Sequence, residues 1–330
     1  MTADNVLLTT AVGSFGKPEY LQKARNANAR GKVSPTELRD LERKATAEWI
    51  KAQEEIGLDI LVDGEMYRGD MVAFFADLLD GYSEGGLVRS YGNRYYHKPV
   101  ISGVLKRPKP MTVEWFQYAQ SLTQKPVKGM LTGPYTMLDW SYNEAYATRR
   151  DAALALAEVV RQEAEDLDQA GARYIQIDEP AIHARPEELE IAIEAMGIVT
   201  QNLKAKTISH ICYGDFAAIY PGILKLPVDQ LDLAMANYEY RWLDLMDRDP
   251  FTKEMAIGIV DVHTHELESI AEAAEGIRKG LRYVSADRLL PHPDCGLKTR
   301  PVDESIAKCR IVVEAAKVVR AELANRAVPA

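Results

Sequence analysis

The stretch TRRDAALALAEVVRQEAEDLDQAGARYIQIDEP, residues 148–180, contains a helical pattern followed directly by a strand pattern. From Thr148 to Ala170 apolar residues recur at steps of three and four, which is typical of a helix with one buried face. Tyr174 to Ile177 is a short run of strand formers, and the carboxylates Asp178 and Glu179 follow it. A helix that leads directly into a buried strand is the repeating unit of α/β proteins with a parallel sheet.

The same alternation extends over the whole chain. Apolar runs of the strand type lie at Val6–Val12, Leu58–Val62, Pro126–Leu131, Tyr174–Ile177, Thr207–Cys212, Leu231–Ala236, Ile257–Val262 and Leu289–Pro293. Helical patterns between them cover Ser34–Ile56, Thr148–Ala170, 186–203, 215–224, 266–280 and 303–323. Ser34, Pro35 and Glu37 form a helix start with an N-cap, an N1 proline and an N3 glutamate. The pattern predicts the α/β class and a (β/α)8 TIM barrel, with a doubly wound sheet and a second domain as the weaker alternative.

A barrel of this kind needs about 250 residues, so the remaining length is expected in insertions. We expect one catalytic TIM-barrel domain over residues 1–330, with an insertion at about 66–125 between strands 2 and 3. The segment Ser90–His97, SYGNRYYH, is rich in aromatic and turn-forming residues and is a candidate lid or docking surface.

Composition excludes several classes of protein. Hydrophobic residues make up 47% and charged residues 27% of the 330, which is ordinary for a globular enzyme and not for a disordered chain. The net charge is −9 and no stretch concentrates Lys and Arg, so a nucleic acid is not an expected partner. No apolar run of about 20 residues exists to span a membrane, and the first residues lack a signal-peptide pattern. We therefore expect a cytoplasmic protein without a membrane partner.

Candidate metal ligands lie at the predicted strand ends. The three cysteines are far apart, which argues against a disulfide framework. His210 and Cys212 are two residues apart on a strand and share a face, and Cys295 follows the last strand. A set of one histidine and two cysteines favours Zn²⁺ with one open position, although cysteines are also often buried simply as small apolar groups. Cys309, in an amphipathic helix, is expected in the core.

Other polar residues also follow the predicted strands. Glu65 and Asp178 would project at the barrel mouth, where they would bind an ammonium group or form salt bridges at the rim. His263 follows Asp261 by two residues and is a candidate for proton transfer, with the acid orienting its ring. The remaining histidines carry no paired signal and are expected to be ordinary; they are His97, His183, His265 and His292.

At these residues the chain resembles the catalytic half of the cobalamin-independent methionine synthases. The matching segments run nearly from end to end: TTAVGSF (9–15), DGEMYRGDM (63–71), SYGNR (90–94), MTVEW (111–115), AQSLTQKPVKGMLTGPYTMLDW (119–140), IQIDEPA (175–181), HICYGDF (210–216) and PDCGLKTR (293–300). The resemblance implies the barrel, a zinc ion and a thiol substrate.

Carried over residue by residue, the resemblance implies roles for most of these positions. It implies that His210, Cys212 and Cys295 bind zinc and that His263 is the catalytic histidine. Five residues are implied to hold the amino-acid end of homocysteine, namely Val12, Gly13, Ser14, Glu65 and Asp178. Arg94 and Trp140 are implied to contact the methyl donor.

Two departures from the family pattern affect the predicted chemistry. The full-length family has a second barrel that helps to bind methyl-folate polyglutamate, and 330 residues leave no room for it. The resemblance to short, single-barrel core enzymes implies methylcobalamin or a methylated corrinoid protein as donor. The family's fourth zinc ligand, a glutamate, falls on Ala234. Asp232 or Glu239 would replace it, or zinc has three protein ligands, which is the arrangement we expect.

The expected function is a zinc-dependent methyltransferase that makes methionine from homocysteine. Two alternatives stay open on the sequence alone. One is a zinc-dependent alkyltransferase acting on another thiol, such as coenzyme M. The other is a non-catalytic zinc- or thiol-binding protein, which would not need His263.

Overall fold

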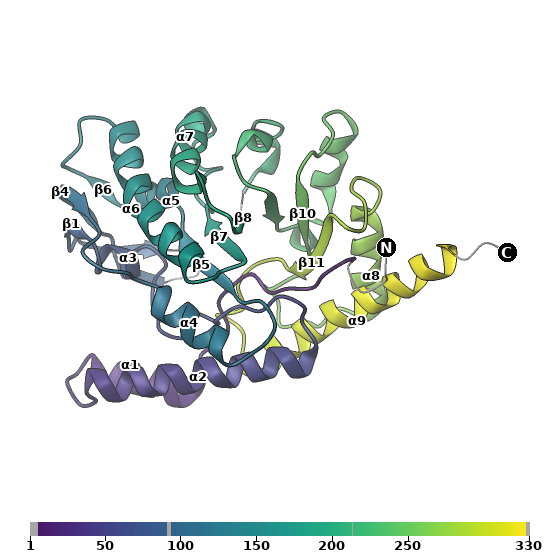
Figure 1. Cartoon of the computed structure of the whole chain (residues 1–330), viewed down its shortest axis with the longest axis horizontal. Helices are drawn as coiled ribbons and strands as arrows, with labels where there is room; N and C mark the ends of the chain where they lie inside the picture. Colours follow the sequence, from purple (N-terminus) through teal and green to yellow (C-terminus); the bar gives the residue numbers. More distant parts are fainter. Residues whose placement is uncertain (1–5, 91–93, 213, 328–330) are drawn as a thin grey trace. The chain divides into compact units, whose positions relative to one another are not determined.

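The computed structural model describes residues 6–90, 94–212 and 214–327. Its largest sheet has six strands in the order β11-β10-β9-β8-β7-β5 (Figure 1). Their bounds are β5 Lys128–Thr132, β7 Tyr174–Asp178, β8 Lys206–Ile211, β9 Gln230–Leu233, β10 Glu254–Val260 and β11 Leu289–Pro293. Strand β7 pairs in parallel with β8, and β10 pairs in parallel with both β9 and β11. Six of the eight predicted strands are therefore present at the predicted places.

The first two predicted strands form single bridges instead of full strands. Thr10 bridges Ile60 and Leu61 bridges Val127, both in parallel, and the N–H of Thr10 donates to the carbonyl of Pro291 at 3.3 Å. These contacts connect β11 through the two extended segments to the start of β5. The sheet therefore has the strand sequence of a (β/α)8 barrel, as the sequence predicts.

The chain divides into two compact units that interleave along the sequence. The first comprises residues 1–67, 118–128 and 230–330, and the second comprises 68–117 and 129–229. Helices of the first unit are α1 Glu19–Asn28, α2 Pro35–Ile56, α8 Ile270–Gly280 and α9 Val302–Ala327, with the 3-10 helices η6 Ala236–Tyr238 and η7 Arg241–Asp247. Helices of the second are α3 Ala73–Ala76, α5 Pro134–Asp139, α6 Arg149–Gln169 and α7 Leu189–Thr200, with η3 Pro186–Glu188, η4 Phe216–Ala218 and η5 Gly222–Lys225. Helix α4, Val113–Ser121, crosses the boundary.

Helix ends follow the capping signals in most cases. Ser34 Oγ accepts from the N–H of Glu37 at the start of α2, and Thr148 caps α6 through the N–H of Asp151. Helix α8 begins at Ile270, later than the predicted 266, because Ser269 forms a capping box with Glu272.

The predicted helix at 215–224 is wrong. Only the short 3-10 helices η4 and η5 form there. Pro221 lies between them, and because proline has no N–H it cannot continue a helix. The predicted helix at 186–203 starts as the 3-10 helix η3 and becomes α-helical only from Leu189.

Part of the predicted insertion forms strands of two small sheets in the second unit. Its strands are β1 Asp80–Ser83, β2 Leu87–Ser90, β3 Arg94–His97 and β4 Val100–Lys106. β2 and β3 form an antiparallel pair, and β1, β4 and β6 (Tyr142–Asn143) form a three-stranded sheet. The candidate lid includes Tyr91–Asn93, which lie outside the described residues.

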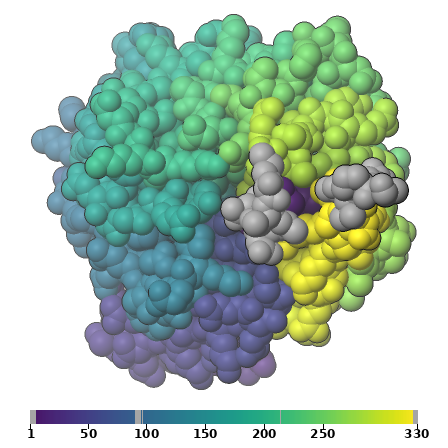
Figure 2. All heavy atoms as spheres, turned by 45° about the vertical axis from the view of Figure 1, so that its right-hand side comes forward, coloured from purple at the N-terminus to yellow at the C-terminus, as the bar shows by residue number. Residues whose placement is uncertain are grey.

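In the first unit the long helices α2 and α9 lie side by side (Figures 1 and 2). Trp49 of α2 stacks on Phe15 with ring centroids 4.1 Å apart, and both side chains are buried. Cys309 of α9 is fully buried, and burial raises the pKa of its thiol to about 12, which confirms its place in the core. None of the helices in the described residues is long and apolar enough to cross a membrane.

Candidate metal centre and substrate-binding residues

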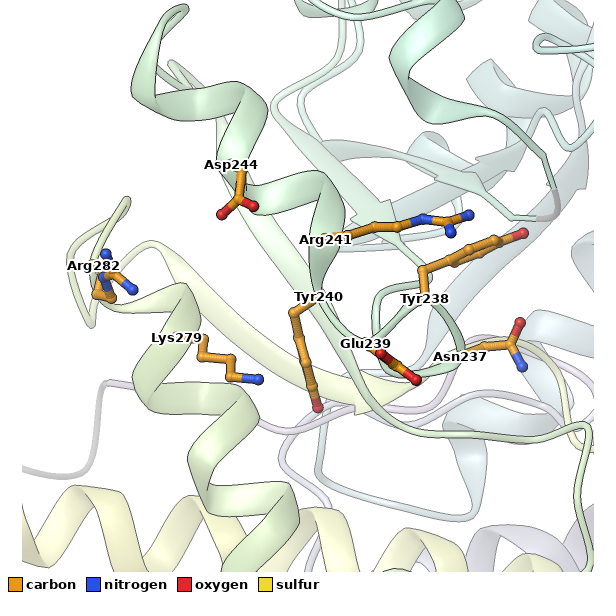
Figure 3. A pocket seen from close by; sticks show the side chains of 8 residues that line it. All are labelled: Asn237, Tyr238, Glu239, Tyr240, Arg241, Asp244, Lys279 and Arg282. Carbon is orange, nitrogen blue, oxygen red and sulfur yellow. The ribbon is translucent and has the colours of Figure 1, made fainter.

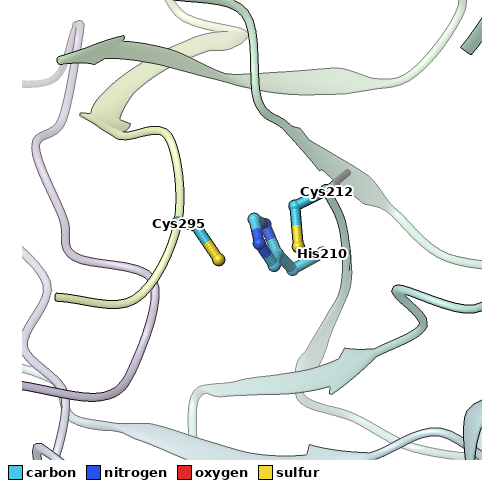
Figure 4. Close-up of side chains that lie close together, drawn as sticks. All are labelled: His210, Cys212 and Cys295. Atoms are coloured by element: carbon cyan, nitrogen blue, oxygen red, sulfur yellow. The ribbon is translucent and has the colours of Figure 1, made fainter. Parts of the chain in front are cut away.

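The three predicted metal ligands lie close together. His210 is in β8, Cys212 follows that strand, and Cys295 comes two residues after β11. His210 and Cys212 are 3% and 7% exposed, and Cys295 is half-buried. The ligand atoms of the three side chains all lie within 4.8 Å of one another (Figure 4).

The chemistry of this donor set fits zinc. Two thiol sulfurs and one imidazole nitrogen are ligands that Zn²⁺ binds in tetrahedral sites. Three protein donors leave a fourth position for water or substrate, which is the pattern of catalytic zinc sites. Neither Asp232 nor Glu239 belongs to the group of ligand atoms found in the described residues.

Asp232 and Glu239 have different surroundings, and Ala234 directly follows β9. Asp232 is fully buried, accepts from Gln230 Nε2 at 2.6 Å and lies 3.6 Å from the ammonium of buried Lys128. Glu239 is exposed and lines an open pocket of about 590 Å³ together with Asn237, Tyr238, Tyr240, Arg241, Asp244, Lys279 and Arg282 (Figure 3). Asp232 therefore interacts with Gln230 and Lys128 in the core, whereas Glu239 faces an open pocket.

Asp294, directly before Cys295, fixes the segment that follows Ala234. Its buried carboxylate accepts backbone N–H groups from Met235 at 2.9 Å, Ala236 at 2.9 Å and Asn237 at 2.6 Å. Burial raises the pKa of Asp294 to about 7, and the three N–H donors oppose that rise. The residue before a candidate metal ligand thus anchors the end of β9.

The Cys295 loop also contacts the Ser14 segment. Ser14 bridges Gly64 in parallel, and its carbonyl accepts the N–H of Leu297 at 2.6 Å. A Cβ on Gly296 would lie 2.2 Å from Ser14 Oγ, so only glycine fits that contact without displacement. Val12 and Gly13 are buried directly before Ser14. The structure therefore brings the segment predicted to bind the substrate next to the loop that carries Cys295.

The two candidate carboxylates for the ammonium group follow different strands. Glu65 is half-buried, has a left-handed backbone with φ 57°, and its N–H donates to Asp63 Oδ1 at 2.9 Å. Asp178 ends β7, is 9% exposed, and accepts from Gln176 Nε2 at 2.7 Å.

Glu179, the neighbour of Asp178, has a structural role that the sequence did not predict. It is fully buried and accepts the N–H groups of Tyr135 and Thr136 at the start of α5. Burial raises the pKa of Glu179 to about 7. The pair Gly133-Pro134, a helix start, was the available signal, because the exposed N–H groups of a helix start favour an acidic partner.

His263 is exposed after β10. Asp261 Oδ1 accepts from the backbone N–H of His263 at 2.7 Å, so the acid fixes the main chain at this histidine. Asp261 Oδ2 also accepts from Asn237 Nδ2 at 3.0 Å, which connects this loop to the segment held by Asp294.

Trp140 is half-buried at the C-terminal end of α5. The adjacent Asp139 pairs with Arg149 at 2.9 Å and with Arg185 at 3.0 Å. Arg94 begins β3 opposite Ser90, and its side chain lies outside the described residues.

The remaining histidines do not belong to the metal group found in the described residues. His97 bonds the carbonyl of Gly85 at 3.1 Å, and His265 pairs with Glu304 at 2.9 Å. Burial lowers the pKa of His183, and His292 is fully buried in β11.

Comparison with known proteins identifies the family. The family model described as the catalytic domain of cobalamin-independent synthase matches residues 7–318. The chain is 38% identical to the methionine synthase of Sulfolobus acidocaldarius, over 97% of this chain and 94% of that one. It is 37% identical to the methionine synthase of Saccharolobus solfataricus, over 97% of each chain.

Solved structures agree with the sequence comparisons. A B12-independent methionine synthase from Shewanella sp. W3-18-1, in complex with selenomethionine, superposes with a TM-score of 0.85 at 27% identity, covering 97% of this chain and 99% of that one. A methyltransferase from Methanosarcina mazei, at 15% identity and a TM-score of 0.65, shares the fold, covering 96% of this chain and 94% of that one. The chain therefore belongs to the catalytic-domain family of the cobalamin-independent methionine synthases, which are methyltransferases with a TIM-barrel fold.

Proposed function

We propose that this methyltransferase is zinc-dependent and transfers a methyl group to the sulfur of homocysteine. The observation that carries the proposal is the cluster of His210, Cys212 and Cys295 ligand atoms within 4.8 Å. These residues would hold zinc, and bound zinc would keep the homocysteine sulfur as a thiolate near neutral pH. No carboxylate among the described residues belongs to the proposed ligand set, so two thiolates and a neutral imidazole would balance the dication.

The amino-acid end of homocysteine is proposed to bind two acidic side chains and a short segment of backbone. The carboxylates Glu65 and Asp178 suit the α-ammonium group, because charge-assisted hydrogen bonds to an ammonium are strong. Backbone N–H groups at Val12, Gly13 and Ser14 suit the α-carboxylate. Together these contacts orient the substrate sulfur, and a fixed orientation lowers the entropic cost of methyl transfer.

His263 is the proposed catalytic residue for proton transfer. It would accept the proton that the homocysteine thiol loses on binding, because a neutral imidazole nitrogen can act as a general base. Its exposure leaves it accessible to solvent, to which that proton passes.

The methyl donor is proposed to be methylcobalamin or a methylated corrinoid protein rather than methyl-folate polyglutamate. The resemblance to short, single-barrel core enzymes supports this donor, and the chain covers 94% and 97% of the length of two methionine synthases that it matches. Trp140 and Arg94 are the proposed donor contacts. The half-buried Trp140 supports this role, since an indole face that is partly open to solvent can pack against a planar ligand.

Selenomethionine in the related Shewanella structure supports an amino-acid substrate rather than another thiol. Selenomethionine differs from methionine, the proposed product, only in selenium for sulfur. A thiol such as coenzyme M has a sulfonate and no ammonium group, so Glu65 and Asp178 would have nothing to bind in it.

The test is methionine formation by the zinc-loaded protein from homocysteine, with methylcobalamin and methyl-folate polyglutamate supplied in separate reactions. The Cys295→Ser variant should lose both zinc and activity, and Cys309→Ser, a change at the buried cysteine outside the cluster, is the matched control. Methionine from methylcobalamin supports the proposal. Methionine from the folate alone would overturn the proposed donor, and full activity without zinc would overturn the metal.

A further inference from the structure

The backbone that carries Glu65 is in an unusual conformation. Gly64 has φ 78° and Glu65 has φ 57°, so two successive residues are left-handed. Glycine tolerates this region, but a glutamate rarely adopts it and needs surrounding contacts to hold it there. On one side Asp63 supplies them, since its Oδ1 accepts the N–H of Glu65 at 2.9 Å and its Oδ2 accepts the hydroxyl of Tyr67 at 2.8 Å.

Two cationic side chains hold the other side of the same turn. Lys17 Nζ donates to the carbonyl of Glu65 at 3.0 Å. Arg25 Nη1 donates to the carbonyls of Met66 and Tyr67, each at 3.2 Å. Three successive carbonyl oxygens are thus bound by cations, which leaves the turn little freedom to change its backbone angles.

The ammonium group of Lys17 lies in an environment that is costly for charge. Burial, together with the nearby charges of Arg25 and Lys298, lowers the pKa of Lys17 to about 8, while the carboxylates of Glu65 and Glu42 partly oppose the shift. Arg25 is itself paired with Glu42 at 2.6 Å, and the side chain of Glu42 is only 10% exposed.

The turn is also connected to the segment that precedes Lys17. Ser14 bridges Gly64, and the N–H of Phe15 donates to the carbonyl of Gly64 at 3.1 Å. Lys17 follows on this same segment. The short stretch from Ser14 to Lys17 therefore includes a proposed contact to the substrate carboxylate, and it also fixes Glu65, the proposed contact to the substrate ammonium group.

We propose that Lys17 and Arg25 are positioning residues that lock the Gly64–Tyr67 turn and so set Glu65 for the ammonium group of the amino-acid substrate. The inference rests on the proposed function, in which Glu65 binds homocysteine. Neither side chain is assigned a contact with the substrate; both act through the carbonyl oxygens of the turn.

A double-mutant cycle tests this role. We compare the wild type with Lys17→Met, Glu65→Gln and the double variant, measuring kcat and KM for homocysteine on zinc-loaded protein, with zinc content determined for each. Lys17→Met should raise KM roughly tenfold with little change in kcat or zinc content, which is the effect of losing one charged hydrogen bond that orients a binding group. Lys17→Arg, which keeps a cationic donor, should restore most of the affinity.

The control is Lys23→Met on α1, the helix that carries Arg25, where the lysine is exposed and pairs with Glu19. It should leave KM unchanged. In the double variant, Lys17→Met should add nothing to the effect of Glu65→Gln.

The outcomes separate the inference from the proposed function. If Glu65→Gln raises KM and Lys17→Met does not, or if the two effects simply add, the positioning role is wrong and the role of Glu65 stands. If Glu65→Gln leaves KM unchanged, both the substrate contact and the positioning role are wrong.

Discussion

Asp178 is a buried carboxylate at the end of β7 that the proposed function assigns to the substrate ammonium. Asp178→Asn removes the charge and keeps the shape, so the KM for homocysteine should rise by at least about tenfold because a charge-assisted hydrogen bond is lost. Glu187→Gln, at an exposed acid in η3, is the matched control. Steady-state kinetics check this, and an unchanged KM in Asp178→Asn would remove the argument for an amino-acid thiol.

A change at His263 distinguishes a catalytic protein from one that only binds zinc or a thiol. His263→Ala should keep the zinc content of the wild type and lower kcat about a hundredfold, since positioned proton transfer contributes at least that factor. His265→Ala, two residues along and exposed, is the control and should retain kcat. Loss of zinc in His263→Ala with unchanged turnover per bound metal would contradict the assignment.

Lys17 predicts a pH dependence of stability. Its pKa is about 8 in the folded protein and near 10.5 when unfolded, so between these values the unfolded chain binds one more proton. The contribution of Lys17 to stability therefore rises as pH increases through this window, and charged Lys17 is destabilising below it. Relative to Lys17→Met, the wild type should gain on the order of 2 kcal/mol between pH 7.5 and 9.5, measured by urea unfolding. A constant difference would show that Lys17 titrates normally.

At the scale of elements, Asp294 joins the end of β9 to the loop that carries Cys295. Asp294→Ala leaves three backbone N–H groups without their acceptor, so unfolding free energy should fall by about 3 kcal/mol. Zinc affinity should fall as well, because Cys295 is the next residue. Asp287→Asn, at an exposed acid outside this network, is the control. Denaturant unfolding and competition with a zinc chelator check both effects, and wild-type zinc affinity in Asp294→Ala would contradict the link.

The elements that the sequence predicts best are those with a buried face and a clear boundary. Helix α2 starts after the predicted N-cap Ser34 and ends at the predicted Ile56, and β7 and β11 fall on their apolar runs. The strands of the insertion escaped prediction because segments such as Asp80–Ser83 are short, largely exposed and lack apolar alternation.

Part of the candidate site could likewise be predicted from the sequence, and part could not. The spacing of His210 and Cys212 predicts a shared strand face, and the structure brings their ligand atoms together with that of Cys295. The roles of Asp294, Lys17 and Arg25 could not be predicted, because their partners are backbone groups distant in sequence, and no pattern of residue types encodes such contacts. The single-domain organisation stays a prediction.

For the whole molecule, the central claim is a zinc site with three protein ligands and one position for the substrate sulfur. Zinc K-edge X-ray absorption of the zinc-loaded protein, with and without homocysteine, tests it most directly. The account predicts two sulfur neighbours without substrate and three with it, at about 2.3 Å, the usual zinc–thiolate distance. A sulfur count that stays at two on adding homocysteine, or a carboxylate of the chain bound to zinc, would contradict it.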